Sequence, residues 1–517
     1  MSLTSILVHH AERFPDRVAL EYDGTETTWA QLLDGTRRTA GVLREVGVQS
    51  GDVVGVLLHN SDRFVELMHA ISHIGAIFMP INWRLAGAEI AYIVEHSGAA
   101  VLVSEPELEP LLEPVRDQLA CRLLRAQGPA GDGWDALDEL RESVAPVVDA
   151  VPLDEDDVHR LMYTSGTTSR PKGVMITYGN LNAKNASHVV EFGMTAEGVN
   201  LACGPLYHVG ALDLTTSTMM YLGARTHIVR RFEPTAVLDA IERHRITDVW
   251  LAPVMIKLLV DQPDIGSRDL SSVRLIIDGG EKMPLPLIER VLSAFPNAWF
   301  ADAYGLTETV SGDTVLDKGR SRDKIGSVGK PVVHLELRVV DDEGNDVAAG
   351  ERGEVILRGP KVCKGYWRDE KATAAALRNG WFHTGDLGVL DEDGFLFIVD
   401  RLKDVIISGG ENIASSEVER AIYEHAAVAE VAVVGRPDER WLEVPVAYVA
   451  LAEGADDVSA ADLEAHCRQR LAGYKVPKAF QFVDALPRNP SGKVLKRELR
   501  DRERDGDAGA PEATSPS

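Results

Sequence analysis

Several features are scarce or missing in this 517-residue sequence, and each absence excludes a class of protein. Only four cysteines occur (Cys121, Cys203, Cys363 and Cys467), and none has CxxC spacing, so a disulfide framework is not expected. No apolar run reaches the roughly 20 residues that cross a bilayer, and the N-terminus lacks the charged-then-apolar pattern of a secretion signal. These absences predict a cytoplasmic protein with free thiols and no membrane span.

Positive charge is scarce as well. The chain has 54 Lys and Arg against 80 Asp and Glu, a formal net charge of −26. A nucleic-acid or anionic-membrane surface needs clustered Lys and Arg, so neither partner is expected. The length and the hydrophobic content of 45% suffice for large cores and at least two domains. The oligomeric state stays open, with a homodimer as one option.

The most informative stretch is residues 163–174, which read Tyr-Thr-Ser-Gly-Thr-Thr-Ser-Arg-Pro-Lys-Gly-Val. Its hydroxyls, two glycines and one lysine form a donor-rich loop of the kind that binds polyphosphate. The apolar run Val158–Tyr163 predicts a buried strand directly before it. A Walker loop is excluded because Lys172 precedes its glycine and Pro171 would break a helix there. Composition alone would also fit a polar surface loop.

The ordered string resembles the phosphate-binding loop of the adenylate-forming superfamily, which includes acyl-CoA synthetases, peptide-synthetase adenylation domains and firefly luciferase. Further motifs follow in the family's order between residues 10 and 500: Asp278-Gly-Gly-Glu, Ala301-Asp-Ala-Tyr-Gly-Leu-Thr-Glu-Thr, His383-Thr-Gly-Asp and Pro487-Arg-Asn-Pro-Ser-Gly-Lys-Val. The chain is therefore identified as a member of the acyl-CoA synthetase or aryl-CoA ligase type.

The resemblance implies an α/β fold in two parts. A large N-terminal domain, residues 1–402, would contain layered α/β sheets and a small β-barrel-like subdomain. A small mobile α+β domain, residues 403–503, would follow a hinge at Lys403. Residues 504–517 have almost nothing to bury and are expected to be disordered.

Local patterns agree with this organisation. Residues 52–58 predict a strand and residues 63–71 a helix, the rhythm of an open α/β sheet. Residues 105–151 lack firm periodicity and are expected to be irregular surface structure. In the last part, residues 430–434 predict a strand and residues 460–471 an amphipathic helix.

For the nucleotide, the resemblance implies that Tyr304 stacks on adenine, Thr307 meets the α-phosphate, Glu308 holds Mg²⁺ and Asp386 accepts from the ribose hydroxyls. Carboxylate and hydroxyl oxygens are hard ligands that suit magnesium. The implied ATP- and AMP-binding set is Thr164, Ser165, Gly166, Thr167, Thr168, Lys172, Gly279, Gly280, Glu281, Asp302, Ala303, Tyr304, Gly305, Thr307, Asp386 and Arg401. The implied catalytic residues are Lys493, Thr307, Glu308 and His208.

The resemblance also implies sites for CoA and for the acid. The CoA set is Arg84, Gly409, Gly410, Glu411, Trp441, Tyr474 and Lys478. The acyl pocket is His208, Val209, Gly210, Gly279, Ala301, Ala303 and Leu306. Small residues leave a deep pocket, and Leu306 stands where acetate enzymes of the family carry a tryptophan, so a sizeable hydrophobic acid is expected.

The implied reaction has two halves: the carboxylate and ATP give acyl-AMP and pyrophosphate, and then the CoA thiol displaces AMP. Lys493 would serve the first half, and rotation about Lys403 would bring Gly409 and Gly410 to the pantetheine channel for the second. Enzymes that load a carrier protein, luciferase-like oxygenases and a catalytically inactive adenylate-binding protein are the other classes weighed.

Ser169 opens one more alternative, because the family usually has glycine there. Serine at positive φ costs about 1–2 kcal/mol, so adenylation could be lost and the protein would only transfer preformed acyl-AMP to CoA. The other interpretation is an ordinary φ at Ser169 and one additional hydrogen bond.

Overall fold

The computed structural model describes residues 3–164, 171–279, 283, 285–401, 404–408, 411–438, 440–455, 458–488 and 494–505. The chain divides into two compact units. The first contains Met1–Leu337, Ile356–His383 and Asp393–Leu396, and the second Arg338–Val355, Thr384–Glu392 and Phe397–Ser517. The predicted domain boundary and the hinge stay predictions, and Lys403 lies outside the described residues.

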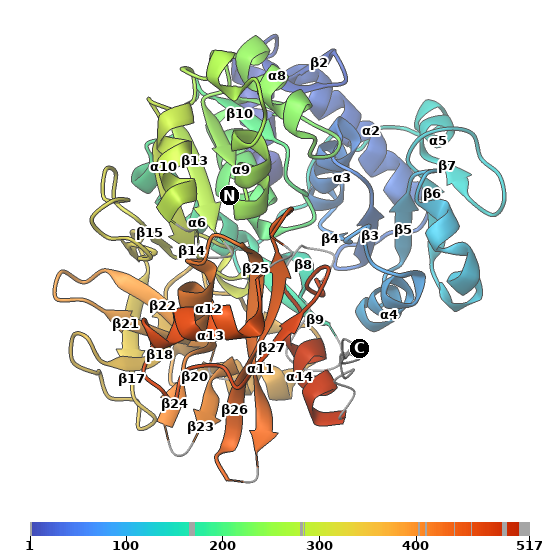
Figure 1. The fold of residues 1–517 in the computed structure, drawn as a ribbon. Helices are drawn as coiled ribbons and strands as arrows, with labels where there is room; N and C mark the ends of the chain where they lie inside the picture. The colour runs from blue at the N-terminus through green and yellow to red at the C-terminus, as the bar shows by residue number, and fades with distance from the viewer. Residues whose placement is uncertain are drawn as a thin grey trace, which may run out of the picture. The chain divides into compact units, whose positions relative to one another are not determined.

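A nine-stranded sheet in the first unit has the order β16-β15-β14-β13-β12-β10-β11-β1-β2 and is parallel from β14 to β1. Helices α8, α9 and α10 lie beside it (Figure 1). The bounds of its strands are β1 Val18–Tyr22, β2 Thr25–Thr28, β10 Val199–Ala202, β11 Arg225–Ile228, β12 Asp248–Trp250, β13 Leu275–Gly279, β14 Trp299–Tyr304, β15 Thr314–Val315 and β16 Lys330–Pro331.

An eight-stranded sheet in the same unit has the order β19-β9-β8-β4-β3-β5-β6-β7. Its strands β3, β4 and β5 are parallel, as the alternation of helix and strand patterns predicts. The bounds are β3 Val53–Leu57, β4 Ile77–Pro80, β5 Val101–Ser104, β6 Arg122–Arg125, β7 Asp135–Ala136, β8 Val158–Thr164, β9 Lys172–Thr177 and β19 Gly365–Tyr366.

Successive side chains of β3 point to opposite faces of the eight-stranded sheet, and each face packs against a layer of helices. Val53 packs on one face of the sheet with Ile90 of α4, while Val54 packs on the other face with Phe64 of α3. Leu20 of the nine-stranded sheet belongs to the same core as Val54 and Phe64. Helices α2 and α3 therefore share one core with both sheets.

Helix starts are encoded locally. Ser61 Oγ accepts from Phe64 N at 3.1 Å at the start of α3, and Thr177 and Asn180 form a capping box at α6.

None of the described helices combines the length and apolar composition of a membrane span. The α-helices are α1 Leu3–Arg13, α2 Trp29–Glu45, α3 Asp62–His73, α4 Gly87–Ser97, α5 Leu137–Ser143, α6 Tyr178–Phe192, α7 Ser217–Leu222, α8 Pro234–His244, α9 Pro253–Val260, α10 Leu285–Ala294, α11 Glu370–Ala376, α12 Ser415–Tyr423, α13 Ala460–Arg468 and α14 Lys496–Asp505. Short 3-10 helices are η1 Glu109–Leu111, η2 Glu113–Gln118, η4 Ile265–Ser267 and η5 Thr307–Thr309, and η3, Gly210–Thr216, is a π-helix.

The expectation of irregular structure at residues 105–151 is wrong in part. Strands β6 and β7 extend the eight-stranded sheet there, and α5 follows them. Leu124 and Trp134 are buried in this region. Strands of two to four residues are too short to show a period, which is why the pattern gives no signal.

A third sheet has five strands, in the order β17-β18-β21-β20 with β22 paired to β21, and the expected β-barrel-like subdomain stays a prediction. The second unit has its own sheet, β24-β23-β26-β25 with β27 paired to β26. The bounds of these strands are β17 Glu336–Val340, β18 Arg352–Arg358, β20 Leu377–Arg378, β21 Trp381–Leu390, β22 Leu396–Arg401, β23 Ile406–Ser408, β24 Glu411–Ile413, β25 Val428–Asp438, β26 Leu442–Leu451 and β27 Ala479–Phe482.

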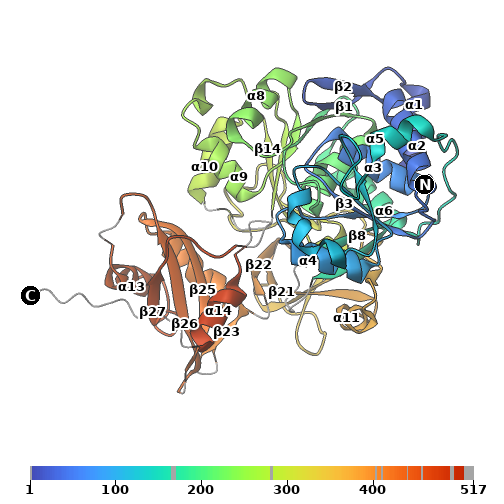
Figure 2. The same cartoon turned by 90° about the vertical axis from the view of Figure 1, so that its right-hand side faces the viewer.

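Strand alternation organises the second unit as well. Val433 of β25 packs on one face with Val418 of α12 and Leu463 of α13. Its neighbour Val434 packs on the opposite face with Leu499 of α14, a helix that lies along the sheet in Figure 2. Helix α14 runs through Asp505, so the predicted tail begins as helix, and residues 506–517 lie outside the described part. The mixed α/β fold class is confirmed.

Candidate active site

The predicted phosphate loop connects two strands of a hairpin. Strands β8 and β9 are antiparallel, and Thr164 lies opposite Lys172. The loop residues Ser165, Gly166, Thr167, Thr168 and Ser169 themselves lie outside the described residues. The Lys172 ammonium lies 5.0 Å from the ring centroid of Tyr366, within the range of a cation–π contact.

Tyr366 also contacts the predicted magnesium ligand. Its Oη donates to Glu308 Oε1 at 2.9 Å, and Cys363 N donates to the Glu308 carbonyl at 2.7 Å. Burial and the charge of Glu308 raise the pKa of the Tyr366 hydroxyl, so it remains a donor. Tyr366 thus joins Lys172 of the hairpin to Glu308 of the Thr-Glu motif. Sequence reasoning missed it, and an aromatic residue directly after Gly365 was the available signal.

The expected adenine site lies where two parallel strands end together. Gly279 of β13 stands opposite Ala303 of β14, one position before the half-buried Tyr304. A Cβ on Gly279 would lie 2.3 Å from the Ala303 carbonyl oxygen, so only glycine fits. Asp302 is buried one residue earlier. Gly280 and Glu281 lie outside the described residues.

The expected acyl pocket begins at His208. Its Nδ1 accepts from Gly210 N at 3.2 Å, so a neutral ring carries its proton on Nε2. A Cβ on Gly210 or on Gly204 would lie 2.6 Å from the ring of Trp250, so both glycines pack directly on that ring. Trp250 therefore packs against the acyl segment at Gly204 and Gly210, a contact for which the sequence contains no signal.

One small core joins the three motifs. Met162 and Val174 of the hairpin, Val209 of the acyl segment, Val310 after the Thr-Glu motif and Cys363 pack together. Burial raises the pKa of Cys363 to about 12, and Glu308 contributes to the shift. The structure therefore brings the phosphate hairpin, the acyl segment and the acidic motif to one place in the first unit. Two more predicted pocket residues, Ala301 and Ala303, are buried in β14, and Leu306 is half-buried before η5.

A buried charge cluster supports the π-helix η3 behind the acyl segment. Arg160 pairs with Asp213 at 2.5 Å, and Lys184 Nζ donates to Ser217 Oγ and to the Asp213 carbonyl, both at 2.7 Å. All three charged side chains are fully buried. Burial lowers the pKa of Lys184 to about 7; Asp213 opposes this shift, and Arg160 adds to it.

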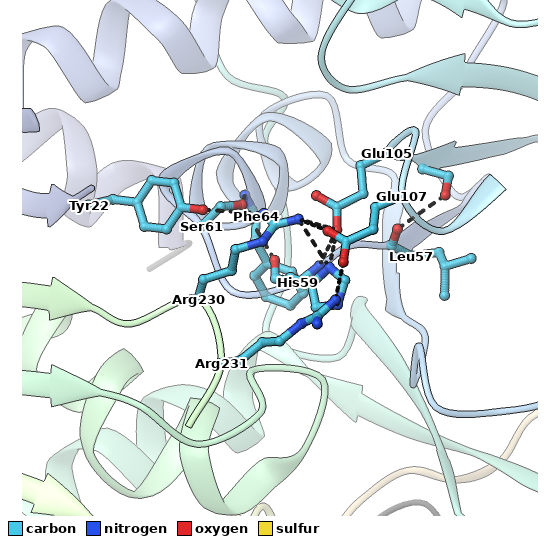
Figure 3. A network of polar contacts seen from close by, with 10 residues as sticks. Tyr22, Leu57, His59, Ser61, Phe64, Glu105, Glu107, Arg230 and Arg231 are labelled. Carbon is cyan, nitrogen blue, oxygen red and sulfur yellow. Dashed lines mark hydrogen bonds and ion pairs between the residues drawn. The ribbon is translucent and has the colours of Figure 1, made fainter. Parts of the chain in front are cut away.

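Arg84, the predicted contact of the CoA phosphate, is exposed. Its guanidinium lies 5.0 Å from the ring centroid of Trp83, and that of Arg231 lies 5.4 Å from the same centroid. Figure 3 shows that Arg231 belongs to a network with His59, to whose Nε2 it donates at 2.8 Å, and with Glu107. Arg84 and Arg231 thus both lie within cation–π range of the Trp83 ring.

Two groups of His and carboxylate side chains have metal-like spacing among the described residues: Glu21 with His227 and His244, and His59 with Glu105 and Glu107. Each already contacts arginine. Arg225 pairs with Glu21, and Arg230 pairs with Glu107 at 2.7 Å and with Glu105 at 3.1 Å (Figure 3). A guanidinium takes the place of a metal cation in both groups.

Other predicted residues belong to the second unit. Asp386 is buried on β21, and its N–H donates to Thr384 Oγ1 at 3.0 Å. Trp441 and Tyr474 are exposed by 43% and 42%, and Lys478 is exposed. Gly409, Gly410 and Lys493 lie outside the described residues, and Arg401 and Glu411 are described only as backbone of β22 and β24.

Comparison with known families then identifies the chain. Residues 7–367 match the AMP-binding enzyme family, and residues 417–493 match its C-terminal domain. The chain belongs to the AMP-binding enzymes. A feruloyl-CoA synthase of Amycolatopsis sp is 41% identical over 495 residues, covering 96% of this AMP-binding enzyme and 98% of the relative. An indoleacetate–CoA ligase of Aromatoleum aromaticum is 38% identical over 506 residues, with 97% and 98% coverage.

Solved structures agree with this assignment. The o-succinylbenzoate CoA synthetase of Bacillus subtilis in complex with its acyl-adenylate is 35% identical, with a TM-score of 0.86 and coverage of 96% and 98%. The same synthetase in complex with ATP and magnesium is 34% identical, with a TM-score of 0.85 and coverage of 96% and 99%. These relatives confirm the predicted class, an ATP-dependent, AMP-forming carboxylate–CoA ligase.

Proposed function

We propose that this AMP-binding enzyme activates an aryl or arylalkyl carboxylic acid as its acyl-adenylate and transfers the acyl group to CoA. The observation that carries the proposal is the meeting of three motifs at Tyr366. Its hydroxyl binds Glu308, its ring lies beside Lys172, and the strand of Lys172 shares a core with Val209 of the acyl segment. The hairpin of Lys172, the Glu308 carboxylate and the Val209 segment thus adjoin one another, which supports acyl-adenylate formation at this place.

The aromatic ring of the acid is inferred from Trp250. Trp250 is buried and packs on Gly204 and Gly210, the segment that carries the predicted carboxylate gate His208, so an aromatic side chain supports the expected pocket. Stacked or edge-to-face contacts between aromatic rings add about 0.5–1.5 kcal/mol beyond burial. Relatives named for ferulate and indoleacetate support the same class of acid.

The donor set fits magnesium. Glu308 offers a half-buried carboxylate whose Oε1 is oriented by Tyr366, and Thr307 beside it offers a hydroxyl. These are the hard oxygen ligands that Mg²⁺ prefers, and the bound ion would neutralise phosphate charge. Lys172 of the hairpin would add a second positive charge to the phosphates, which is electrostatic stabilisation of the kind that dominates phosphoryl chemistry.

CoA and the ribose would engage the other predicted residues. Arg84, joined by Arg231 over the same indole ring, would bind a CoA phosphate. Trp441, Tyr474 and Lys478 would line the approach of CoA, and Asp386 would accept from the ribose hydroxyls. The alternatives, transfer from preformed acyl-AMP only and loading of a carrier protein, gain no support from the relatives.

The test is a panel of acids with ATP, Mg²⁺ and CoA, in which AMP, pyrophosphate and the acyl-CoA are each measured. We expect ferulate, indole-3-acetate or a similar aromatic acid to give the highest kcat/KM, with one AMP formed per acyl-CoA. Acetate or palmitate as the best substrate would refute the aromatic assignment. Pyrophosphate release without acyl-CoA formation would refute CoA transfer.

Separate half-reactions should depend on separate residues. Lys493→Ala is expected to abolish acyl-AMP formation and to spare CoA transfer from synthetic acyl-AMP. Gly409→Leu is expected to do the reverse, because a side chain would obstruct the pantetheine arm. Equal loss of both halves in both variants would contradict these assignments.

A further inference from the structure

Lys361 is a buried lysine that no predicted motif contains. Its side chain is 1% exposed, and three oxygens surround its ammonium group: the carbonyls of Ser311 at 2.7 Å and Gly312 at 2.6 Å, and Asp313 Oδ1 at 3.0 Å. A buried ammonium is costly unless its protons are satisfied and its charge is paired. Lys361 therefore binds the segment that follows Glu308 at three consecutive residues.

That segment has an unfavourable backbone. Val310, Ser311 and Gly312 have φ values of 58°, 65° and 61°, the left-handed region that favours glycine. Val310 is β-branched and rarely adopts it. Such a turn persists only where surrounding contacts hold it, and Ser311 N donates to the Leu306 carbonyl at 2.8 Å. The two Lys361 hydrogen bonds to carbonyls act directly on this turn.

The same stretch of chain also reaches Glu308. Two residues after Lys361, the Cys363 N–H donates to the Glu308 carbonyl, and Tyr366 donates to its carboxylate. Lys361, Cys363 and Tyr366 therefore hold the Glu308 segment at the turn behind it, at its backbone and at its side chain.

We propose that Lys361 is a positioning residue for Glu308: by fixing the left-handed turn Val310–Gly312 it sets where the Glu308 carboxylate meets the magnesium-bound nucleotide. This inference rests on the proposed function of Glu308. It predicts that loss of Lys361 impairs magnesium-dependent nucleotide binding and the first half-reaction, and leaves CoA transfer from synthetic acyl-AMP near the wild-type rate.

The experiment compares three variants with the wild type. Lys361→Met removes the ammonium, and Lys361→Met with Asp313→Asn also removes the carboxylate that would otherwise be left unpaired. Lys364→Met is the matched control, since Lys364 is exposed and binds only the Asp156 carbonyl among the described contacts, at 2.9 Å. Calorimetry would measure the affinity for α,β-methylene-ATP with Mg²⁺ and for AMP without it, and thermal unfolding would measure stability.

We expect Lys361→Met to weaken the magnesium-dependent affinity at least tenfold, to change the affinity for AMP less than threefold and to lower the unfolding temperature. In the double variant the unfolding temperature should recover, because no buried charge is unpaired, while the nucleotide affinity should stay weak. Lys364→Met should match the wild type in every measurement.

Two results would overturn the inference: wild-type magnesium-dependent affinity in Lys361→Met, or recovery of both affinity and stability in the double variant. The second result would make Lys361 part of the core only. Failure of the proposed function has a different signature, because the wild type itself would then show no magnesium-dependent nucleotide binding.

Discussion

The residues expected to bind the adenylate and those expected to bind CoA are held in opposite ways. Around Glu308 the contacts come from buried groups, with Lys361 and Asp313 almost fully enclosed and Tyr366 fixed by a hydrogen bond. The aromatic side chains expected to meet CoA, Trp441 and Tyr474, are more than 40% exposed. Groups that stabilise charge in a transition state must be in place beforehand, whereas a binding surface for a long, flexible substrate can order when the substrate arrives.

The largest effect should follow a substitution among the preorganised residues expected to bind the adenylate. Glu308→Gln removes the charge but keeps the shape, and we expect acyl-AMP formation to fall by about 10²–10³-fold, as for loss of one preorganised electrostatic group. CoA transfer from synthetic acyl-AMP should be nearly unchanged. Pyrophosphate release measures the first half. Glu336→Gln, an exposed glutamate paired with Arg358, is the control, and an equal loss there would contradict the assignment.

On the exposed side, Trp441→Ala should raise the KM for CoA by about tenfold, since loss of one stacking or apolar contact costs roughly 1–2 kcal/mol. The rate of acyl-AMP formation should not change, because the first half-reaction needs no CoA. Steady-state kinetics with varied CoA measure the KM for CoA. Pyrophosphate release without CoA measures the rate of acyl-AMP formation separately. A defect confined to acyl-AMP formation would show that Trp441 acts with the adenylate-binding residues and not with the CoA-binding residues.

A smaller effect is expected at Trp250, which packs on the segment of the expected acyl pocket. Trp250→Phe should shift the preference for bulky over small aromatic acids by about three- to tenfold, because a smaller ring gives the acid more room. The affinity for AMP alone should stay the same. The measurement is the ratio of kcat/KM for indole-3-acetate and benzoate. An unchanged ratio would mean that the acid does not reach Trp250.

The most specific effect concerns the dependence of stability on pH. In the folded protein the pKa of Lys184 is about 7, against 10.5 for an ordinary lysine, because it is buried and Arg160 competes for Asp213. Between these values the unfolded chain holds a proton that the folded chain has lost, so raising the pH stabilises the fold. The gain is at most about 1.4 kcal/mol per pH unit and vanishes below pH 7.

The Lys184→Met variant has no titrating group at this position, so it lacks this dependence of stability on pH. The difference in the free energy of unfolding between wild type and variant should therefore move in favour of the wild type as pH rises from 7 to 9. Urea unfolding at three pH values measures it. A constant difference would mean that Lys184 keeps its proton in the folded protein.

Motif order predicted the reaction class and the fold class because the ordered strings resemble those of a known family, and Asp278-Gly-Gly-Glu also places a glycine at the end of a strand, which the sequence records directly. Gly279 illustrates this, since the backbone contact that excludes a side chain is what the glycine encodes. Trp250 and Lys361 were not predictable, because each acts through a contact between segments distant in sequence, and for Tyr366 the aromatic residue after Gly365 was the one signal. Their own neighbourhoods look like ordinary strand or turn residues.

The prediction of irregular structure at residues 105–151 failed for a related reason. Strand β6 is four residues long, and its burial comes from pairing with β5 rather than from its own pattern. A sequence pattern detects elements that bury a face by themselves. It does not detect those that are completed by a neighbour.

The position of Cys363 bears on the chemistry of a reactive intermediate. An acyl-adenylate is an electrophile, and any thiolate beside it would be acylated in competition with CoA. Cys363 touches the segment of Glu308, yet burial and the Glu308 charge raise its pKa to about 12, so the sulfur stays a thiol at pH 7. Because the fold buries this sulfur near a carboxylate, the Cys363 thiol stays protonated and does not react with the acyl-adenylate. The acyl group is then left for the thiol of the incoming substrate.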